Sequence, residues 1–312
     1  MVMMINTKSQ VEEFPAVSSL DIEKSLLALK ECPTTLMFHA EMIPPISDSV
    51  GDDIQTSAPP LAPKGPLNAY STFLSSRPPA FETCAVAEIL SLAHLAPELQ
   101  LHIVHLSAVE AIPMLRKARA DGIKITAETC FHYLALAAEG IQEGDTRHKC
   151  CPPIRSQANQ DGLWEELVRD REDGVIQTVV SDHSPCTPEI KLLPEHLAPR
   201  DLASTCASSS SSSSEQAKGD FFSAWGGISS VGLGLPILWT EGQKRQGAAF
   251  SIEDVVRWCC RNTAKQVGLE KSKGDLGVGF DADIVVFDPE AEFLVCFFSS
   301  SLILPFVKRR EY

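Results

Sequence analysis

The feature that most constrains this chain is a repeated alternation of short apolar segments with longer amphipathic ones. Residues 99–107 (LQLHIVHLS), 123–130 (IKITAETC) and 174–182 (GVIQTVVSD) are typical of buried strands. Between them, residues 108–122 and 160–170 carry the apolar spacing of helices. Strands that alternate with helices in this way predict βαβ units and a parallel sheet.

Polar residues stand where the predicted strands end. They are His39, His105, Glu128 and Asp182. In a (β/α)₈ barrel, chemistry is located at the C-terminal ends of the strands, so four independent strand ends suggest one shared site. A doubly wound sheet would favour a glycine-rich first turn, and neither GxGxxG nor GxxxxGK[ST] occurs. We therefore predict an α/β chain that forms a partial TIM-like (β/α)₈ barrel.

The predicted organisation has two parts. Residues 1–265 form the partial barrel, and residues 266–312 form the remnant of a C-terminal β region. Within the barrel, residues 43–68 read as a loop and residues 192–218, with their serine run, as a disordered insertion. Residues 293–312 are apolar, but serines and a proline interrupt them, so we expect β structure there rather than a membrane helix.

Charge and cysteine usage limit the partners and the compartment. The net charge is −14, and the one basic run is at residues 308–310, so we expect no nucleic-acid partner. The ten cysteines include no CxxC pair, and the first residues lack the apolar stretch of a signal peptide. We expect reduced thiols in a cytoplasmic protein that does not enter a membrane.

Two histidine-ended strands and one aspartate-ended strand predict a metal site formed by His39, His105 and Asp182. Imidazole and carboxylate are ligands of catalytic zinc centres, which keep one position open for water. Asp182 could also serve as the general base. His102 is three residues before His105, so the two point to opposite faces of a strand, and His105 is the better ligand. The alternative for each histidine is a hydrogen-bonded core residue.

Three further segments allow two interpretations each. Glu128, Cys130 and His132 occupy alternate positions and would share a face, either as ligands or as supporting and packing residues. Residues 149–155 (KCCPPIR) could hold a main-chain group for a ligand or only connect a strand to a helix. Residues 224–229 (AWGGIS) could bring the backbone close to a ligand or form a plain turn.

These motifs, in this order along the chain, resemble those of cyclic amidohydrolases, the group of hydantoinases, dihydroorotases and allantoinases. Residues 181–191 (SDHSPCTPEIK) and 224–229 are similar to allantoinase segments in particular. The resemblance implies a TIM-like barrel with a small β-sandwich. It also implies two divalent ions, usually zinc, bridged by a carboxylated lysine and a hydroxide.

Carried over to this chain, the resemblance assigns His39 and His105 to the second ion. Asp182 becomes a ligand of the first ion and the catalytic base. The backbone near Cys151, and near Gly226 and Gly227, would hold the ring amide of the substrate.

The reaction implied is hydrolytic opening of the hydantoin ring of allantoin to allantoate, by an enzyme that is a homo-oligomer when complete. Two alternatives stay open. One is a hydrolase of the dihydroorotase or hydantoinase type, and the other is a non-catalytic scaffold protein related to this group.

The chain also departs from this group. The His-x-His that opens the family's barrel is absent, and Lys8, the candidate for the bridging lysine, lies too close to residues 12–17 (EEFPAV). We therefore expect the sequence to start in mid-barrel, with roughly four strands absent. Parallel strand edges exposed by a partial barrel pair readily with other chains. A chain of this kind is predicted to aggregate and to lack activity by itself.

Overall fold

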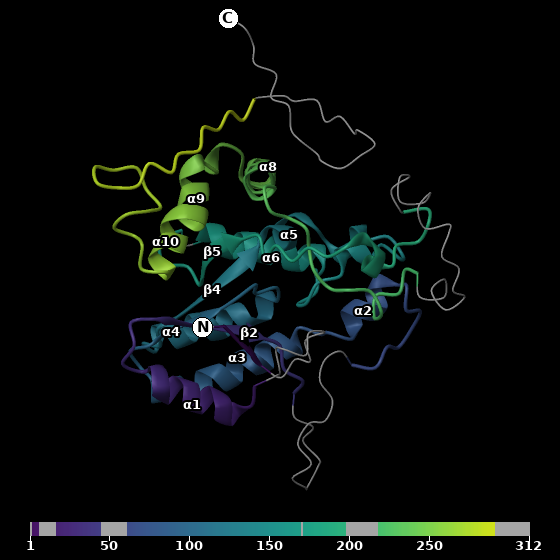
Figure 1. Cartoon of the computed structure of the whole chain (residues 1–312), viewed down its shortest axis with the longest axis horizontal. Helices are drawn as coiled ribbons and strands as arrows, with labels where there is room; N and C mark the ends of the chain where they lie inside the picture. The colour runs from purple at the N-terminus through teal and green to yellow at the C-terminus, as the bar shows by residue number, and fades with distance from the viewer. Residues whose placement is uncertain (1, 6–16, 45–60, 170, 198–217, 291–312) are drawn as a thin grey trace, which may run out of the picture.

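The computed structural model describes residues 2–5, 17–44, 61–169, 171–197 and 218–290. Its centre is a five-stranded sheet in which every neighbouring pair is parallel and the spatial order follows the chain order (Figure 1). The strands are β1 (Val2–Ile5), β2 (Thr35–Ala40), β3 (Gln100–Ile103), β4 (Ile125–Cys130) and β5 (Ile176–Val180). Sequential parallel order is the arrangement of a (β/α)₈ barrel, so the predicted partial barrel is confirmed.

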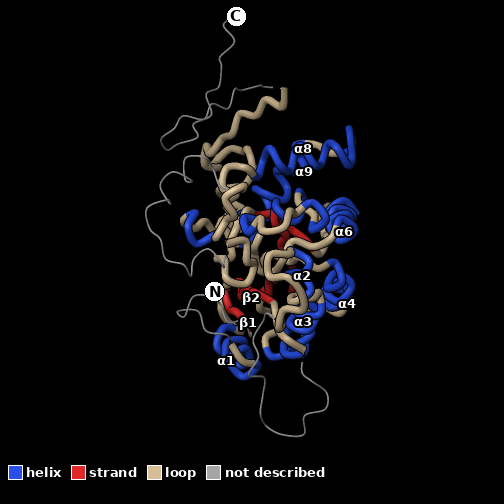
Figure 2. The backbone as a smooth tube through the Cα atoms, turned by 90° about the vertical axis from the view of Figure 1, so that its right-hand side faces the viewer, coloured by secondary structure: helices blue, strands red, loops and turns tan. Residues whose placement is uncertain are grey.

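Helices connect the strands and cover one side of the sheet. Helices α3 (Ala80–Leu92), α4 (Ile112–Ala120) and α6 (Gln157–Arg169) line the right-hand side of the view in Figure 2. The other helices are α1 (Ser19–Leu29), α2 (Tyr70–Ser75), α5 (Phe131–Ala135), α8 (Gly234–Gln246), α9 (Ile252–Val256) and α10 (Asn262–Gln266). A π-helical segment, Arg257–Arg261, joins the last two.

Helix α1 illustrates how the sequence specifies these elements. Ser18 and Asp21 form a capping box, in which each side chain binds the backbone N–H of the other residue. Ile22 and Leu26, four residues apart, are fully buried against the core, whereas Leu20 and Leu27 are largely exposed. The helix therefore buries a narrower apolar stripe than its leucine content suggests.

The core lies between the sheet and these helices. In β2 to β5, alternate residues point toward the helices and are buried, and they include Leu36, Phe38, Leu101, Ile103, Ile125, Ala127 and Ile176. The opposite faces of the same strands carry polar side chains toward the interior of the partial barrel. Because strand side chains alternate, each strand supplies core and site residues together.

The predicted β structure after residue 266 does not form in the described part of the chain. Residues 269–290 contain no strand, and the yellow trace in Figure 1 runs along the outside of α9 and α10. Val278, Val285 and Val286 are almost fully exposed. β-branched residues favour a strand only when a neighbouring strand and an apolar layer cover them, and the described residues supply neither.

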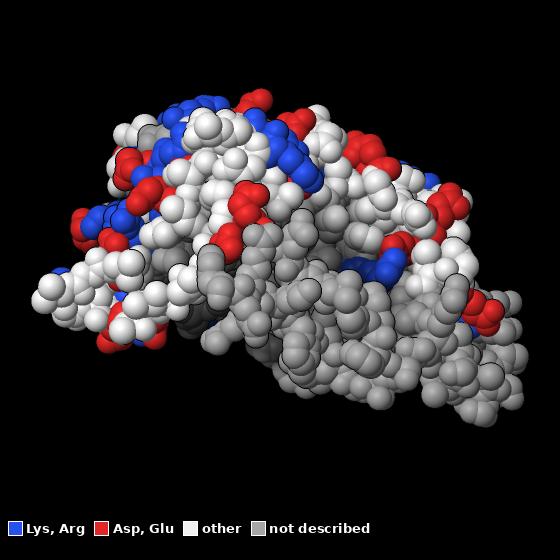
Figure 3. Space-filling view, turned by 90° about the horizontal axis from the view of Figure 1, so that it is seen from above, with Lys and Arg blue, Asp and Glu red and all other residues white. Residues whose placement is uncertain are grey.

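Several predicted features lie outside the described residues. They are most of the loop over 43–68, the serine run of the insertion over 192–218, and the apolar segment 293–312. Within the described residues, no helix combines the length and the apolar character needed to cross a membrane. Acidic and basic side chains lie intermingled over the described surface seen in Figure 3.

Candidate metal centre

His39 and His105 meet at the C-terminal end of the sheet. Nδ1 of His39 and Nε2 of His105 are 2.8 Å apart, and both side chains are buried. His39 is on β2, and His105 follows β3, which pairs with β2. His105 has a φ of 39°, in the left-handed region that non-glycine residues rarely adopt. The two predicted histidine ligands are therefore brought together, one of them on strained backbone.

Hydrogen bonds from both sides hold the strained turn at His105. The backbone N–H of Val104 donates to the carbonyl of Phe38, and that of Leu106 donates to the carbonyl of Glu128. The hydroxyl of Thr129 donates to the carbonyl of Leu106 at 2.9 Å. Strained backbone persists where its surroundings over-determine it, and such positions concentrate at functional sites.

Asp182 follows β5 at the same end of the sheet and also has a positive φ, of 45°. Its side chain is exposed on one side, yet the protein atoms around the carboxylate partly desolvate it. This desolvation raises the pKa of Asp182 to about 6, with the nearby Glu128 adding to the rise and His39 opposing it. A carboxylate with such a pKa can accept and return a proton near neutral pH.

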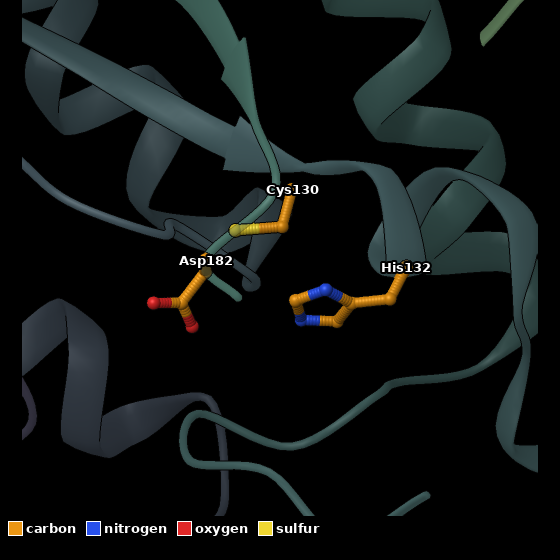
Figure 4. A group of neighbouring side chains, drawn as sticks. All are labelled: Cys130, His132 and Asp182. Carbon is orange, nitrogen blue, oxygen red and sulfur yellow. The ribbon is translucent and has the colours of Figure 1, made fainter. Parts of the chain in front are cut away.

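The close neighbours of Asp182 are Cys130 and His132. One ligand atom from each of these three residues lies within 4.8 Å of the others, and the side chains face one another in Figure 4. The predicted trio of His39, His105 and Asp182 is a looser arrangement, in which the histidines touch and Asp182 acts on His39 electrostatically. We use "the rim" for His39, Glu41, His105, Cys130, His132 and Asp182.

Glu128, Cys130 and His132 were expected to share one face of a strand, but β4 ends at Cys130 and only the first two belong to it. Oε2 of Glu128 lies 3.0 Å from Nε2 of His102, deeper in the sheet. The strand ends at Cys130 and α5 begins at Phe131, so His132 reaches Cys130 from a helical turn rather than by strand alternation. As expected, His102 and His105 face different partners, because Nδ1 of His102 pairs with the Thr126 hydroxyl.

Several nitrogen atoms of the rim have no hydrogen-bond partner. They are Nδ1 of His105 and both ring nitrogens of His132, and both residues are buried. Burial lowers the pKa of His105 well below its usual value and that of His132 to about 3, so both imidazoles are neutral. Neutral imidazole, carboxylate and thiol are zinc donors, and buried polar atoms without partners are rare. The residues at the rim therefore fit a divalent metal ion.

A buried ion pair between Glu41 and Arg77 lies next to His39 of the rim. Glu41 is fully buried, and its Oε2 accepts from Arg77 at 2.7 Å and lies 3.4 Å from Nε2 of His39. Burial alone would raise the pKa of Glu41, but Arg77 and His39 outweigh it and lower the pKa to about 2. Glu41 is therefore ionised, and it orients His39 through a charged hydrogen bond.

A second buried network fixes the loop that carries His105. Glu82 of α3 accepts from the backbone N–H of Ser107 at 2.8 Å, from its hydroxyl at 2.6 Å and from Arg155 at 2.6 Å. Arg155 also donates to the Ser107 hydroxyl at 2.9 Å. The loop after β3 is thereby tied to α3 and to the segment over 149–155.

Three segments that the sequence analysis singled out meet beside Asp182. Ser184 donates its N–H to the carbonyl of Ile228 at 2.9 Å, and Gly227 donates its N–H to the carbonyl of Lys149 at 2.8 Å. A Cβ at Gly227, where φ is 136°, would lie 2.2 Å from the Ser184 carbonyl oxygen. The close approach expected of this glycine pair is thus an approach to the chain's own backbone. Whether Cys151, Gly226 and Gly227 hold a substrate stays a prediction.

Lys191 binds these segments together. It is the last residue of the motif over 181–191, but no role was predicted for it. Its ammonium donates to the carbonyls of Gly227 at 2.6 Å and Trp225 at 3.0 Å, with those of Lys149 and Thr146 at 3.5 Å. Burial lowers its pKa, and also lowers that of Lys149 to about 8. Arg77, Glu82 and Arg155 were missed in the same way, because a charged residue in a loop or helix gives no sequence signal of burial.

The opposite end of the sheet contains a cavity of about 1350 Å³. Its lining includes Thr35, Gln100, Thr126, Gln177 and Lys265, at or near the N-terminal ends of the strands, and no residue of the rim. In parallel α/β barrels the chemistry is placed at the C-terminal ends, so the rim is the better candidate for the site.

Comparison with known proteins agrees with this geometry. Residues 99–308 match the model of the Amidohydrolase family. The chain is 47% identical to the allantoinase of Saccharomyces cerevisiae over 282 residues, and 38% identical to that of Streptomyces avermitilis over 287 residues. These alignments cover 90% and 92% of this chain but 52% and 54% of the relatives. The chain therefore spans about half the length of the curated relatives that it matches.

Solved structures of similar fold are hydantoinases. The D-hydantoinase from Bacillus sp. AR9 has a TM-score of 0.67 and 26% identity, covering 94% of this chain and 56% of the other. The D-hydantoinase (dihydropyrimidinase) from Thermus sp. has a TM-score of 0.69 with the same coverages, and at 24% identity it supports the fold alone. The family model extends over most of the chain and includes the strands that carry His105, Cys130 and Asp182, so this chain belongs to the amidohydrolase family.

Proposed function

We propose that this chain acts as a metal-dependent cyclic amidohydrolase that opens the hydantoin ring of allantoin to give allantoate. The observation that supports the proposal is the 2.8 Å contact of His39 with His105 at the C-terminal end of a parallel sheet, where Asp182 follows β5. The identity to allantoinases supports the choice of substrate.

The proposed cofactor is a divalent ion, with zinc as the first choice because the donors are imidazole and carboxylate. When bound, such an ion lowers the pKa of water and polarises a carbonyl group. His39 and His105 would hold it. Glu41 would keep the His39 ring in place through the 3.4 Å contact between its Oε2 and Nε2 of His39.

The protein's own contribution to the reaction is proton transfer and orientation. Asp182 would accept the proton of the attacking water as the C–O bond forms, and would deliver it to the ring nitrogen as the C–N bond breaks. Its raised pKa, about 6, suits both steps near neutral pH. Main-chain groups near Cys151 and Gly227, held by Lys149 and Lys191, would orient the ring amide.

The test is a ring-opening assay of the full 312-residue chain supplied with zinc, beside Asp182→Asn and His105→Ala variants. Ring opening by the wild-type chain would show that a partial barrel suffices, against the inactivity expected above for a chain of this kind, and it should fall by at least about 100-fold in both variants. Activity that persists in Asp182→Asn would contradict the role given to this carboxylate.

Hydantoin is the second candidate substrate, because the solved neighbours named above are hydantoinases. Allantoin, hydantoin and dihydroorotate assayed side by side would rank the three, and we expect allantoin to have the highest kcat/KM. A scaffold role without catalysis would be supported if zinc bound and no ring opened.

The same family context suggests how the protein exists in the cell. We infer a reducing compartment such as the cytoplasm, because all eight cysteines of the described residues are free. We also infer self-association, since β1 and β5 are edge strands of the described sheet. Size-exclusion chromatography with light scattering tests this inference, and a monomer at micromolar concentration would contradict it.

A further inference from the structure

The structure places a thiol, an imidazole and a carboxylate around one point of the rim. Cys130 is the last residue of β4, His132 lies in the first turn of α5, and Asp182 follows β5. Cys130 pairs in register with Val180, so Asp182 stands two residues beyond its partner. Neighbouring parallel strands that end at the same level bring these side chains together, and the turn into α5 adds the third.

We propose that Cys130, His132 and Asp182 form a thiolate-containing site for a divalent cation. The inference rests on the proposed function, since it gives two further ligands to an ion at Asp182, the residue that the resemblance assigns to the first ion. The contacting histidine pair, His39 and His105, is the part of the rim that the resemblance assigns to the second ion.

The distances suit a single ion. Zinc bonds to sulfur, nitrogen and oxygen at ~2.0–2.3 Å place the ligands of a tetrahedron roughly 3.3–3.8 Å apart. The three ligand atoms lie within 4.8 Å of one another, so rotamer adjustments of about 1 Å would complete the geometry. Asp182 is exposed, and this leaves a side open for a fourth ligand.

His132 supplies an independent observation. Its side chain is 97% buried, since its exposed fraction is 3%, and neither ring nitrogen has a hydrogen-bond partner. In Figure 4 its ring points toward Cys130 and Asp182. A buried imidazole without a partner is unusual in proteins, and a cation between these residues would supply the missing interaction.

The donor set selects the kind of cation. A thiolate favours zinc, cobalt and cadmium, whereas magnesium and calcium prefer oxygen ligands alone. Binding exchanges the thiol proton for the metal, so one proton is released to solvent for each sulfur–metal bond that forms. The site is therefore expected to discriminate against the hard cations.

Cobalt(II) provides the test, because a cobalt–thiolate bond gives a near-ultraviolet charge-transfer band that histidine and carboxylate ligands do not give. The reduced, metal-free full chain is titrated with cobalt chloride. We expect the band to appear in the wild-type chain and in Cys84→Ser, a control at a half-buried cysteine on α3. The band should be absent in Cys130→Ser and should persist in His105→Ala.

A second variant guards against a folding defect. His132→Gln retains the thiol, so the band should remain at saturation while the apparent cobalt affinity falls about tenfold or more. Circular dichroism of each variant checks that the fold is retained.

The outcomes separate this inference from the proposed function. Cobalt bound by the wild-type chain without the band, or a band that survives in Cys130→Ser, would overturn the inference and leave the proposed function standing. A band without ring opening would support the inference and count against the proposed function. No cobalt binding at all would contradict both.

Discussion

The two ends of the parallel sheet differ in the burial of their charged and polar side chains. At the rim, His39, Glu41 and His105 are buried, and Glu41 forms an ion pair that excludes water. At the other end, Lys124 pairs with Glu98 at 2.6 Å while their side chains are 49% and 78% exposed. Water screens such exposed pairs and makes them nearly neutral for stability. Polar groups at the rim cost free energy to bury, so their retention points to function.

Backbone strain follows the same division. In the described part of the chain, the non-glycine residues with positive φ are His105, Asp182 and Leu192, and the first two belong to the rim. Among the described strands, no residue at the N-terminal end has this conformation. The sheet is therefore regular where it only supports the fold, and the backbone is strained at His105 and Asp182, two of the candidate ligands.

The largest effect should come from removing the buried partner of Glu41. Arg77→Met leaves the Glu41 carboxylate buried without its charge partner, and we expect the free energy of unfolding to fall by about 3–5 kcal/mol. Urea denaturation of the full chain measures it. The double variant Glu41→Gln/Arg77→Met should recover most of the loss, and a double variant as unstable as Arg77→Met would contradict the account.

The buried imidazoles should make the metal-free chain sensitive to mild acid. His132 has a pKa of about 3 when folded, against its usual value of about 6.5, so the unfolded chain binds a proton that the folded chain does not. Its contribution is complete above pH 6.5 and falls by about 1.4 kcal/mol for each pH unit toward pH 3.

Urea unfolding with EDTA from about pH 7.5 to pH 5 measures this slope. His132→Gln should reduce this slope by about 1.4 kcal/mol per pH unit, which is the contribution of one bound proton. Parallel curves for the wild type and the variant would mean that His132 is not buried as a neutral ring.

The close approach of Gly227 to Ser184 should tolerate no side chain. In Gly227→Ala the new Cβ would lie 2.2 Å from the Ser184 carbonyl oxygen, at a φ of 136°. We expect a loss of about 1–3 kcal/mol in stability and weaker protection of the Ser184 amide from hydrogen exchange. Gly122→Ala is the matched control, because its φ is also positive, 92°, but nothing lies within 4 Å. Equal losses in the two variants would show that strain alone, and not the contact, matters.

The smallest effect belongs to the N-terminal end. Lys124→Ala removes an exposed ion pair with Glu98, and we expect a change of less than about 1 kcal/mol that shrinks further in high salt. A loss comparable to that of Arg77→Met would erase the distinction between the two ends.

The sheet and its polar end could be predicted from the sequence, because both depend on patterns within short segments of the chain. Apolar strands that end in His39, His105 and Asp182 combine a short-range pattern with a general property of parallel sheets, so the contact of His39 with His105 could be anticipated. The ligand roles of the three residues stay a prediction. Helices α2, α5 and α8 were not anticipated, since their apolar spacing is weak.

The rest depended on contacts between distant segments. The partners of Lys191 come from two distant segments, residues 146–149 and 225–227, and no local pattern specifies them. The proximity of Cys130 and His132 to Asp182 arises because β4 ends at Cys130, and element boundaries are poorly specified by sequence. The valines after residue 277 predicted strands, yet in the described structure they have no partner layer.

Zinc content is the most direct test of the central claim that the rim holds a divalent ion. The full chain, its His105→Ala variant and a Lys124→Ala control are dialysed against the same buffered zinc solution, and bound zinc is measured by mass spectrometry. We predict that the wild type and Lys124→Ala retain equal zinc, and that His105→Ala retains less by about one ion per chain. Equal zinc in all three, or none in any, would contradict the assignment of His105 as a ligand and with it the metal centre described above.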